Sequence, residues 1–231
     1  MRIDPAGRPF IIGALAIAVL VGAGVTSILA VPFAVLAAAF LFFFRDPERR
    51  AHVDITGDDV VLAPADGKVL VAGPALANST PPGSWQQISI FLSPIDVHVN
   101  RVPVSGRVTR VTFTRGRFLP AYQPAAAARN ERSEIWIDHN GQTIVARQIV
   151  GILARRVVCR LEAGATVRAG ERFGIMKFGS RMDVFVPSNA TVTVKVGQAV
   201  RSGETVIAVL HSGETRAEGE RAEVRSLPDS D

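Results

Sequence analysis

Four residues of this chain combine types and spacings that could perform acid–base or nucleophilic chemistry. Asp96 and His98 are two positions apart in a β-like run, so a regular strand would place both side chains on one face. Ser180 follows Gly179 in a predicted tight turn between two apolar runs, and Asp66 lies in the turn-like sequence Pro-Ala-Asp-Gly. Each also has an ordinary structural explanation, so none of them alone indicates an enzyme.

The rest of the composition excludes several kinds of site. A single cysteine, Cys159, rules out an internal disulfide and a multi-cysteine zinc site, and we expect no metal. The net charge of +5 favours an anionic partner, either lipid headgroups or a nucleic acid. The basic residues are scattered without an aromatic-basic motif, so we expect no nucleic-acid binding.

Short β-branched runs separated by Gly and Pro fill the chain after Arg45 and predict an all-β fold, a sandwich or barrel. Residues 163–176 match residues 196–209 at one constant offset, and Pro64–Val69 matches Pro103–Val108 more weakly. Such repeats are typical of lipoyl- and biotinyl-type modules. They describe a fold and do not give a function.

The N-terminal part of the chain has no charged residue from Pro9 to Phe44, which is longer than the roughly 20 residues that span a bilayer. We expect one tilted membrane helix or a helical hairpin, with Pro32 breaking or kinking the helix. Basic residues on both flanks favour a hairpin with its ends at the cytoplasmic face of the cell membrane. The predicted division is a membrane segment, 1–44, a catalytic β domain, 45–210, and a disordered polar tail, 211–231.

Several separated motifs, taken together, resemble the short bacterial and archaeal form of phosphatidylserine decarboxylase. The resemblance covers roughly residues 42–210, in family order. Its motifs are Phe44-Arg45-Asp46-Pro47, Ala63-Pro64-Ala65-Asp66-Gly67-Lys68-Val69, Phe91-Leu92-Ser93-Pro94-x-Asp96-x-His98-x-x-Arg101-x-Pro103, Asn130-Glu131-Arg132 and Lys177-Phe178-Gly179-Ser180-Arg181.

The resemblance implies a zymogen that cuts itself between Gly179 and Ser180, giving a β chain, 1–179, and an α chain, 180–231, that form a heterodimer. Ser180 would become a covalent pyruvoyl group that forms a Schiff base with membrane phosphatidylserine and supports its decarboxylation to phosphatidylethanolamine. By analogy with the family, Asp66 would orient His98, and His98 would activate Ser180 and later donate a proton. Asp96 would hold His98 or the substrate. A higher oligomer is left open.

One departure from the family concerns Arg101, which stands where longer members carry a second histidine. A guanidinium suits phosphate or carboxylate, so we expect Arg101, with Asn130 and Arg132, to bind substrate. Because the residues expected to process the chain all follow the membrane segment, a chain without residues 1–44 is expected to mature. Two alternatives remain open: a membrane-tethered serine peptidase that uses Asp66, His98 and Ser180, and a non-enzymatic carrier or adaptor-like barrel.

Overall fold

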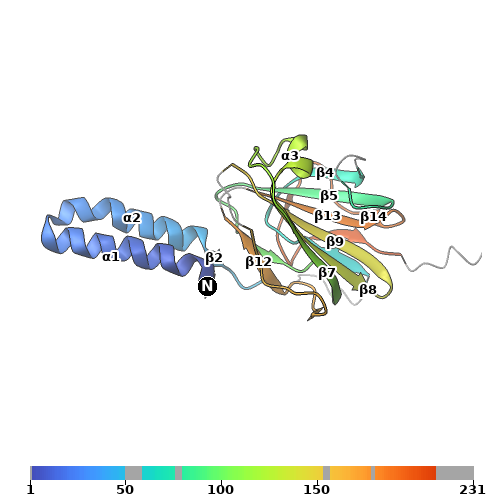
Figure 1. The fold of residues 1–231 in the computed structure, drawn as a ribbon, viewed down its shortest axis with the longest axis horizontal. Coiled ribbons are helices and arrows are strands. Elements are labelled where there is room, and N and C mark those ends of the chain that lie inside the picture. The colour runs from blue at the N-terminus through green and yellow to red at the C-terminus, as the bar shows by residue number, and fades with distance from the viewer. Residues whose placement is uncertain (1, 50–58, 76–79, 153–156, 178–179, 212–231) are drawn as a thin grey trace, which may run out of the picture.

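Figure 1 shows the computed structural model of the chain, in which two packed helices project from a β-rich body. The structure describes residues 2–49, 59–75, 80–152, 157–177 and 180–211. Gly179 and nearly all of the predicted polar tail therefore lie outside the described residues.

The uncharged N-terminal segment forms a helical hairpin. Helix α1 spans Arg8–Gly24 after the short 3-10 helix η1 (Pro5–Gly7), and α2 spans Ser27–Phe43. Of the two effects predicted for Pro32, a break or a kink, the break is wrong, because Pro32 lies within α2. The chain instead reverses at Val25–Thr26, where Thr26 is extended and its side chain accepts a hydrogen bond from the Ile28 amide.

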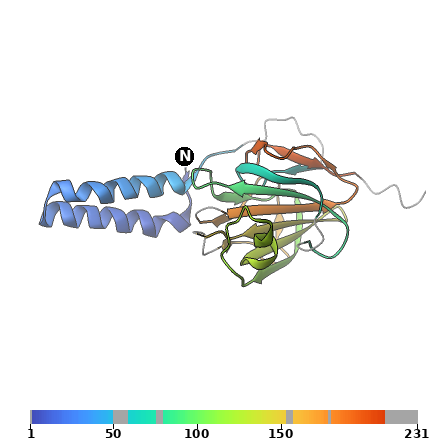
Figure 2. The ribbon, with the colours of Figure 1, turned by 90° about the horizontal axis from the view of Figure 1, so that it is seen from above.

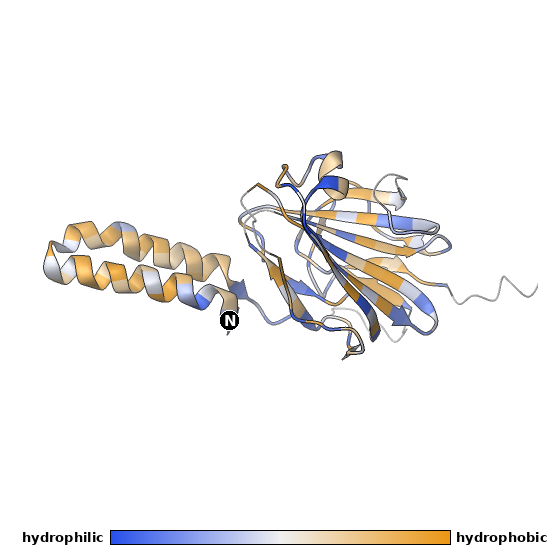
Figure 3. Ribbon diagram, viewed as in Figure 1, coloured by the Kyte–Doolittle hydropathy of each residue, from blue (hydrophilic) through white to orange (hydrophobic). Residues whose placement is uncertain are grey.

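Most residues of this hairpin are apolar (Figure 3), and many of their side chains are exposed. The stretch Pro5–Gly24 is, by length and composition, able to cross a membrane, and only 17% of its apolar window is buried. Exposed apolar surface on this scale is costly in water. The finding is therefore consistent with association of this end of the protein with a membrane.

The body is built from antiparallel strands, which confirms the prediction of a mostly β fold. A curled sheet has the order β11-β7-β8-β9-β13-β5-β4-β15. Its strands are β4 (Gly67–Pro74), β5 (Trp85–Leu92), β7 (Gly106–Thr114), β8 (Arg132–His139), β9 (Gln142–Ile149), β11 (Thr166–Val167), β13 (Ser180–Pro187) and β15 (Ala199–Val200). The helix α3 (Pro124–Arg129) lies in the long connection between β7 and β8.

Three smaller sheets accompany the large one, with the orders β10-β12-β6, β14-β16-β3 and β1-β2. Their strands are β1 (Arg2–Ile3), β2 (Arg45–Asp46), β3 (Val60–Leu62), β6 (Val99–Arg101), β10 (Val157–Cys159), β12 (Arg172–Met176), β14 (Thr191–Val192) and β16 (Val206–Val209). The main core lies between these layers, and one face of β5 and of β13 contributes fully buried aliphatic side chains to it.

The sequence repeat corresponds to repeated contacts. Gly170 donates its amide to the Val102 carbonyl and Gly203 donates to that of Ala63, both at 2.8 Å. Both glycines have positive φ, +79° and +70°, which a side chain would oppose. Bulges also interrupt β4 and β7 at matching positions. The repeat is thus structural, whereas a likeness to lipoyl or biotinyl modules is not confirmed.

Candidate functional site

The candidate site lies at one end of the curled sheet, where several strands begin or end together. Ser180, the first residue of β13, pairs with Leu92, the last of β5. Next to them Arg181 pairs with Ile149 near the end of β9. This end of the sheet faces the base of the hairpin in both views (Figures 1 and 2). The register therefore places Ser180 on the side of the β body from which the hairpin projects.

Ser180 is completely buried, and its hydroxyl oxygen has no hydrogen-bond partner within the part of the chain that the structure describes. A buried hydroxyl without a partner carries a desolvation cost of about 1–3 kcal/mol. Its neighbour Arg181 points to the opposite face of the sheet, where its Nε donates to Asp183 at 2.5 Å. The residue that follows the serine, Arg181, thus takes part in a structural ion pair.

The His98 side chain is held by a backbone carbonyl. His98 precedes β6, and a turn from Ser93 to Asp96 comes before it, so the expected shared strand face of Asp96 and His98 is wrong. The Asp96 carboxylate instead accepts from the Ser93 amide at 2.8 Å. The Asp96 carbonyl lies 2.9 Å from Nδ1 of His98. Since a carbonyl only accepts, Nδ1 carries the proton and Nε2 has the basic lone pair.

Burial makes this imidazole neutral at ordinary pH. His98 is fully buried, and desolvation lowers its pKa from 6.5 to about 4, although the Asp96 carbonyl and carboxylate oppose the shift. Arg45 contributes a further lowering of that pKa. A neutral imidazole is the form that a general base requires.

His98 and Ser180 lie on the same rim of the β body. The Met176 amide donates to the His98 carbonyl at 3.3 Å, and Ile175 pairs with Val99. Ser180 follows Met176 by four residues, a path of at most about 14 Å. From the other side, the turn before β6 connects His98 to Leu92, the strand partner of Ser180. Two independent chain paths therefore keep the pair on the same side of the β body.

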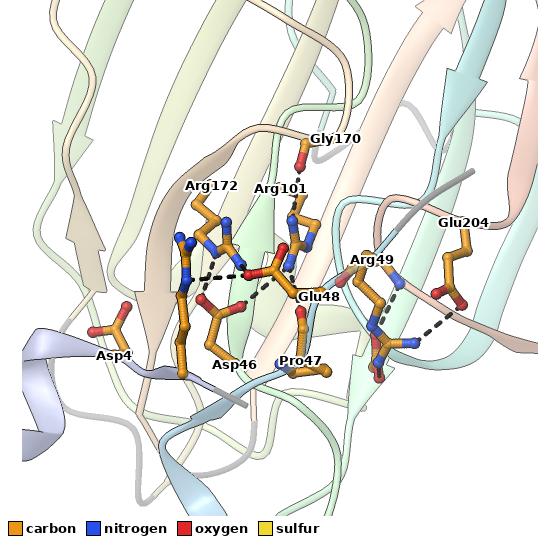
Figure 4. A network of polar contacts seen from close by, with 12 residues as sticks. Asp4, Asp46, Pro47, Glu48, Arg49, Arg101, Gly170, Arg172 and Glu204 are labelled. Carbon is orange, nitrogen blue, oxygen red and sulfur yellow. Dashed lines mark hydrogen bonds and ion pairs between the residues drawn. The ribbon is translucent and has the colours of Figure 1, made fainter.

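Asp66 makes different contacts from those expected. One carboxylate oxygen accepts from Arg49 at 2.7 Å, and the other accepts from the Ser202 amide at 2.8 Å. Arg49 also binds Glu204 at 3.1 Å, a contact drawn in Figure 4. The orientation of His98 by Asp66 stays a prediction, since the contacts described for the Asp66 carboxylate are with Arg49 and Ser202.

The internal repeat explains one of these two contacts. Asp66 corresponds to Ser105, whose hydroxyl accepts from the Ala169 amide at 3.0 Å, just as Asp66 accepts from the Ser202 amide. The turn therefore needs a side-chain acceptor at this position in both copies. In one copy the acceptor is a neutral serine. The turn therefore does not need the negative charge of Asp66 or its ion pair with Arg49.

Arg101 is surrounded by protein oxygens (Figure 4). Its terminal nitrogens donate to the Gly170 carbonyl at 3.0 Å, the Pro47 carbonyl at 2.9 Å and the Asp46 carboxylate at 3.1 Å. Burial lowers the pKa of the guanidinium below its usual range, with Arg172 adding to the shift and Asp46 opposing it. In this arrangement Arg101 fastens the segment after the hairpin to the β body.

Asn130 lies in the connection between β7 and β8, and Arg132 is the first residue of β8. The fully buried Asn130 amide binds both backbone groups of Leu119 and the Val150 carbonyl, at 2.8 to 2.9 Å. Arg132 donates to Glu134 at 3.3 Å and to the Ala128 carbonyl at 3.1 Å. Asn130 thus holds two loops together, whereas Arg132 is partly open to solvent.

Sequence reasoning gave no role to Phe43 or Arg45. The Phe43 ring lies 4.1 Å from the His98 ring between centroids. Arg45 donates to the Ile95 carbonyl at 2.6 Å, in the turn that precedes His98. The available signal was the motif Phe44-Arg45-Asp46-Pro47, which stood out in the sequence without a function of its own. Among the described residues there is no group of three or more side chains that could hold a metal ion.

Comparison with known proteins gives a consistent result. A family model described as phosphatidylserine decarboxylase matches residues 36–208. A protein of Chlorobium limicola is 43% identical over 217 residues, covering 89% of this chain and 99% of that protein. One from the Wolbachia of Brugia malayi is 39% identical over 90% of this chain and 88% of its own length. One from Salinibacter ruber is 46% identical over 74% of this chain and 75% of its own. All three are named phosphatidylserine decarboxylase proenzyme.

Proposed function

This chain belongs to the phosphatidylserine decarboxylase family, and we propose that it becomes active by cutting its own backbone between Gly179 and Ser180. As a family member it is an enzyme that decarboxylates phosphatidylserine, and its relatives are named as proenzymes. The observation that carries the cleavage proposal is the buried hydroxyl of Ser180, which has no partner among the described residues, on the same rim as a neutral histidine.

In the proposed reaction the Ser180 oxygen attacks the Gly179 carbonyl carbon while His98 Nε2 accepts the hydroxyl proton. The peptide bond breaks, its nitrogen gains a proton, and an ester joins the two parts of the chain. Removal of the Cα proton of residue 180 then expels the Gly179 carboxylate and leaves a dehydroalanine. Its imine tautomer takes up water and releases ammonia, which leaves a pyruvoyl group at the start of the α chain.

The residues around position 180 fit such a group, because the serine from which it forms is buried and its oxygen is not committed elsewhere among the described residues. A pyruvoyl group there supplies the electron sink for loss of carbon dioxide from the amine-linked substrate. In this proposal His98 also holds the proton that must be delivered to the substrate carbon.

Asp66 acts in this proposal as a positioning residue. It fixes the turn before β4 through Ser202 and Arg49, and the same turn accepts the Arg101 amide at the Pro64 carbonyl, 2.9 Å away. Asp66 therefore acts on His98 indirectly, through β6.

The other predicted site residues have separate roles in this proposal. Asp96 orients the imidazole through its carbonyl, and Arg101 and Asn130 hold loops. The partly exposed Arg132 is the candidate for binding the substrate phosphate.

The two chains produced by cleavage are expected to stay together. The α chain begins with β13, which lies between β9 and β5 in the middle of the curled sheet. Eight residue pairs join β13 to β5, and five join it to β9.

In this proposal the hairpin holds the site at the membrane that contains the substrate, and we assign this face to the cytoplasm. The division 1–44, 45–210 and 211–231 remains part of the proposal.

Intact-mass analysis of the purified chain tests the proposal. Wild type is expected as two fragments, 1–179 and 180–231, the second carrying pyruvoyl in place of serine, and Ser180→Ala as one chain. Ser202→Ala is the matched control, because Ser202 is also fully buried and its hydroxyl also lacks a described partner. An uncut wild type with an unmodified Ser180 would refute self-cleavage and favour the peptidase or the carrier alternative.

A further inference from the structure

The last turn of the membrane hairpin forms part of the catalytic site. Phe43, the final residue of α2, lies against the His98 ring with a centroid separation of 4.1 Å and an angle of 36° between the ring planes. Phe43 is 6% exposed and His98 is fully buried. The imidazole is thus covered on one side by a side chain that belongs to the hairpin.

The position of Phe43 is fixed from both directions along the chain. Phe44 is completely buried and meets Phe43 edge to face at 5.0 Å. Both phenylalanines pack with Val97, Val99 and Ile175, which belong to the turn before β6 and to β6 and β12. The hairpin base therefore shares one small apolar core with the strands that hold His98.

Arg45 connects the same two parts through polar contacts. One terminal nitrogen donates to the Phe42 carbonyl at 2.8 Å and the other to the Ile95 carbonyl at 2.6 Å. Ile95 lies in the turn whose next residue, Asp96, holds the imidazole. Asp46, the neighbour of Arg45, receives hydrogen bonds from Arg101 and Arg172 (Figure 4). The segment after the hairpin is thus bonded to both sides of the His98 turn.

We infer that the hairpin positions the catalytic histidine: Phe43 holds the plane of the His98 ring and excludes water from it, and Arg45 fixes the turn that carries it. This inference rests on the proposed role of His98 at Ser180. It makes the hairpin a working part of the active site in addition to a membrane attachment. Phe43 and Arg45 are positioning residues, because they act through His98.

The charged groups around the ring allow this inference to be tested through pH. Asp96 on its own turn raises the pKa of His98, and Arg45 from β2 lowers it. Lys177, after β12, lies 5.0 Å above the Phe10 ring, within the aromatic cluster that continues through Phe44 to Phe43. Desolvation is the largest influence on the pKa of His98, so removal of the covering ring should move that pKa back toward 6.5.

The experiment measures the rate of chain cleavage against pH, using full-length proenzyme made by cell-free synthesis in detergent micelles. Wild type is expected to mature at nearly the same rate at pH 5.5 and pH 8. Phe43→Ala is expected to lose up to about tenfold at pH 5.5 relative to its own rate at pH 8, as a histidine with a pKa near 6.5 would. Phe43→Leu keeps most of the cover and is expected to show a smaller loss.

Leu41→Ala is the matched control, since Leu41 belongs to the same helical turn but is 40% exposed, and it should retain the wild-type profile. If Phe43→Ala does not fold, Phe43→Leu tests the inference, which then requires its cleavage rate to be lower at pH 5.5 than at pH 8. Wild-type profiles in both Phe43 variants would overturn the inference while leaving the role of His98 intact. Maturation of His98→Gln at the wild-type rate would instead refute the proposed function of His98.

Discussion

At the scale of single residues, the backbone carbonyl of Asp96 does what a carboxylate does in many catalytic triads, because it fixes the tautomer and the orientation of an imidazole. A carbonyl adds no full charge, so it stabilises an imidazolium less than a carboxylate would. Burial beneath Phe43 then keeps His98 neutral. Such a site suits a base that must accept a proton only briefly and return it.

The lowered pKa of His98 predicts a pH-dependent stability. Between about pH 6.5 and 4 the unfolded chain binds more protons at this position than the folded chain does, so stability falls as the pH falls through that window. The loss should approach about 3 kcal/mol on an order-of-magnitude basis. Chemical denaturation of uncut Ser180→Ala at both pH values measures it, and the double variant with His98→Gln should lack this component. Equal pH dependence in both variants would contradict the prediction.

Asp66 provides a second prediction at this scale. Asp66→Asn keeps an acceptor for the Ser202 amide but removes the ion pair with Arg49, which retains Glu204. We expect a loss of about 1–3 kcal/mol in stability and a slower cleavage rate. Ser105→Ala is the control, since it removes the equivalent turn contact in the other repeat copy. The two variants are compared by denaturation and by cleavage rate. Cleavage of Asp66→Asn at the wild-type rate would assign Asp66 to the turn alone.

At the scale of elements, the hairpin and the three-stranded sheet β10-β12-β6 depend on each other. A chain without residues 1–44 loses Phe43 and Phe44 from the core shared with Val97, Val99 and Ile175. It also loses Asp4, which binds Arg160 at 2.7 Å. Maturation of the β domain alone stays a prediction, and these lost contacts lead us to expect that it is slower than in the full chain.

We predict that residues 45–231 mature at least about tenfold more slowly than the full chain, because the cover over His98 is absent and buried apolar surface becomes exposed. The fraction of cleaved chain over time, in matched detergent, measures the effect. The full-length chain with Leu41→Ala, treated identically, controls for changes on the outside of the hairpin. A soluble, folded 45–231 chain that matures at the full-length rate would show that the hairpin is an anchor only.

The elements themselves were largely predictable from the sequence, whereas the contacts between them were not. Alternation of apolar residues and Gly-rich turns located β4, β5, β7 and β9, and the repeat located matching turns at Gly170 and Gly203. The strand predicted from the spacing of Asp96 and His98 was wrong at Asp96. The Asp96 side chain accepts a hydrogen bond within its own turn, and a turn residue two positions before a histidine looks the same in sequence as a strand residue there. The helix break was predicted at Pro32 although the second helix begins after Thr26. Proline is the stronger helix-breaking signal in a sequence, and a threonine cap is easily overlooked.

The candidate site shows the same limit. The positions of Ser180 and His98 followed from motifs, but the partners of Asp66 and Arg101 depended on which turns meet in space. Arg49 and Asp46, which bind them, precede them by 17 and 55 residues. No local pattern encodes such a distance along the chain. The contact of Phe43 with His98 was hidden for the same reason, because an apolar residue in a membrane segment has an obvious role already.

At the scale of the whole molecule, we expect the hairpin to set how the enzyme meets the membrane. Its two helices of 17 residues each are about 25 Å long, less than the roughly 30 Å of a bilayer core. The two chain ends of the hairpin pair with each other as β1 and β2. Asp4 and Asp46 connect these ends to the β body through Arg160 and Arg101. The tip should therefore end inside the bilayer while the site stays at the surface from which the hairpin entered.

Thiol labelling tests this arrangement. In a Cys159→Ser background, Val25→Cys places a thiol at the tip and Ile95→Cys places one beside the hairpin base. The two native side chains are 72% and 71% exposed in the structure, so protection of one thiol reports the bilayer and not the protein. With a membrane-impermeant maleimide we expect Ile95→Cys to react in inside-out vesicles and Val25→Cys to react in neither inside-out vesicles nor spheroplasts. After detergent is added, both should react. Labelling of Val25→Cys in intact spheroplasts would show that the hairpin crosses the whole membrane, and labelling in inside-out vesicles would show that it lies outside the bilayer.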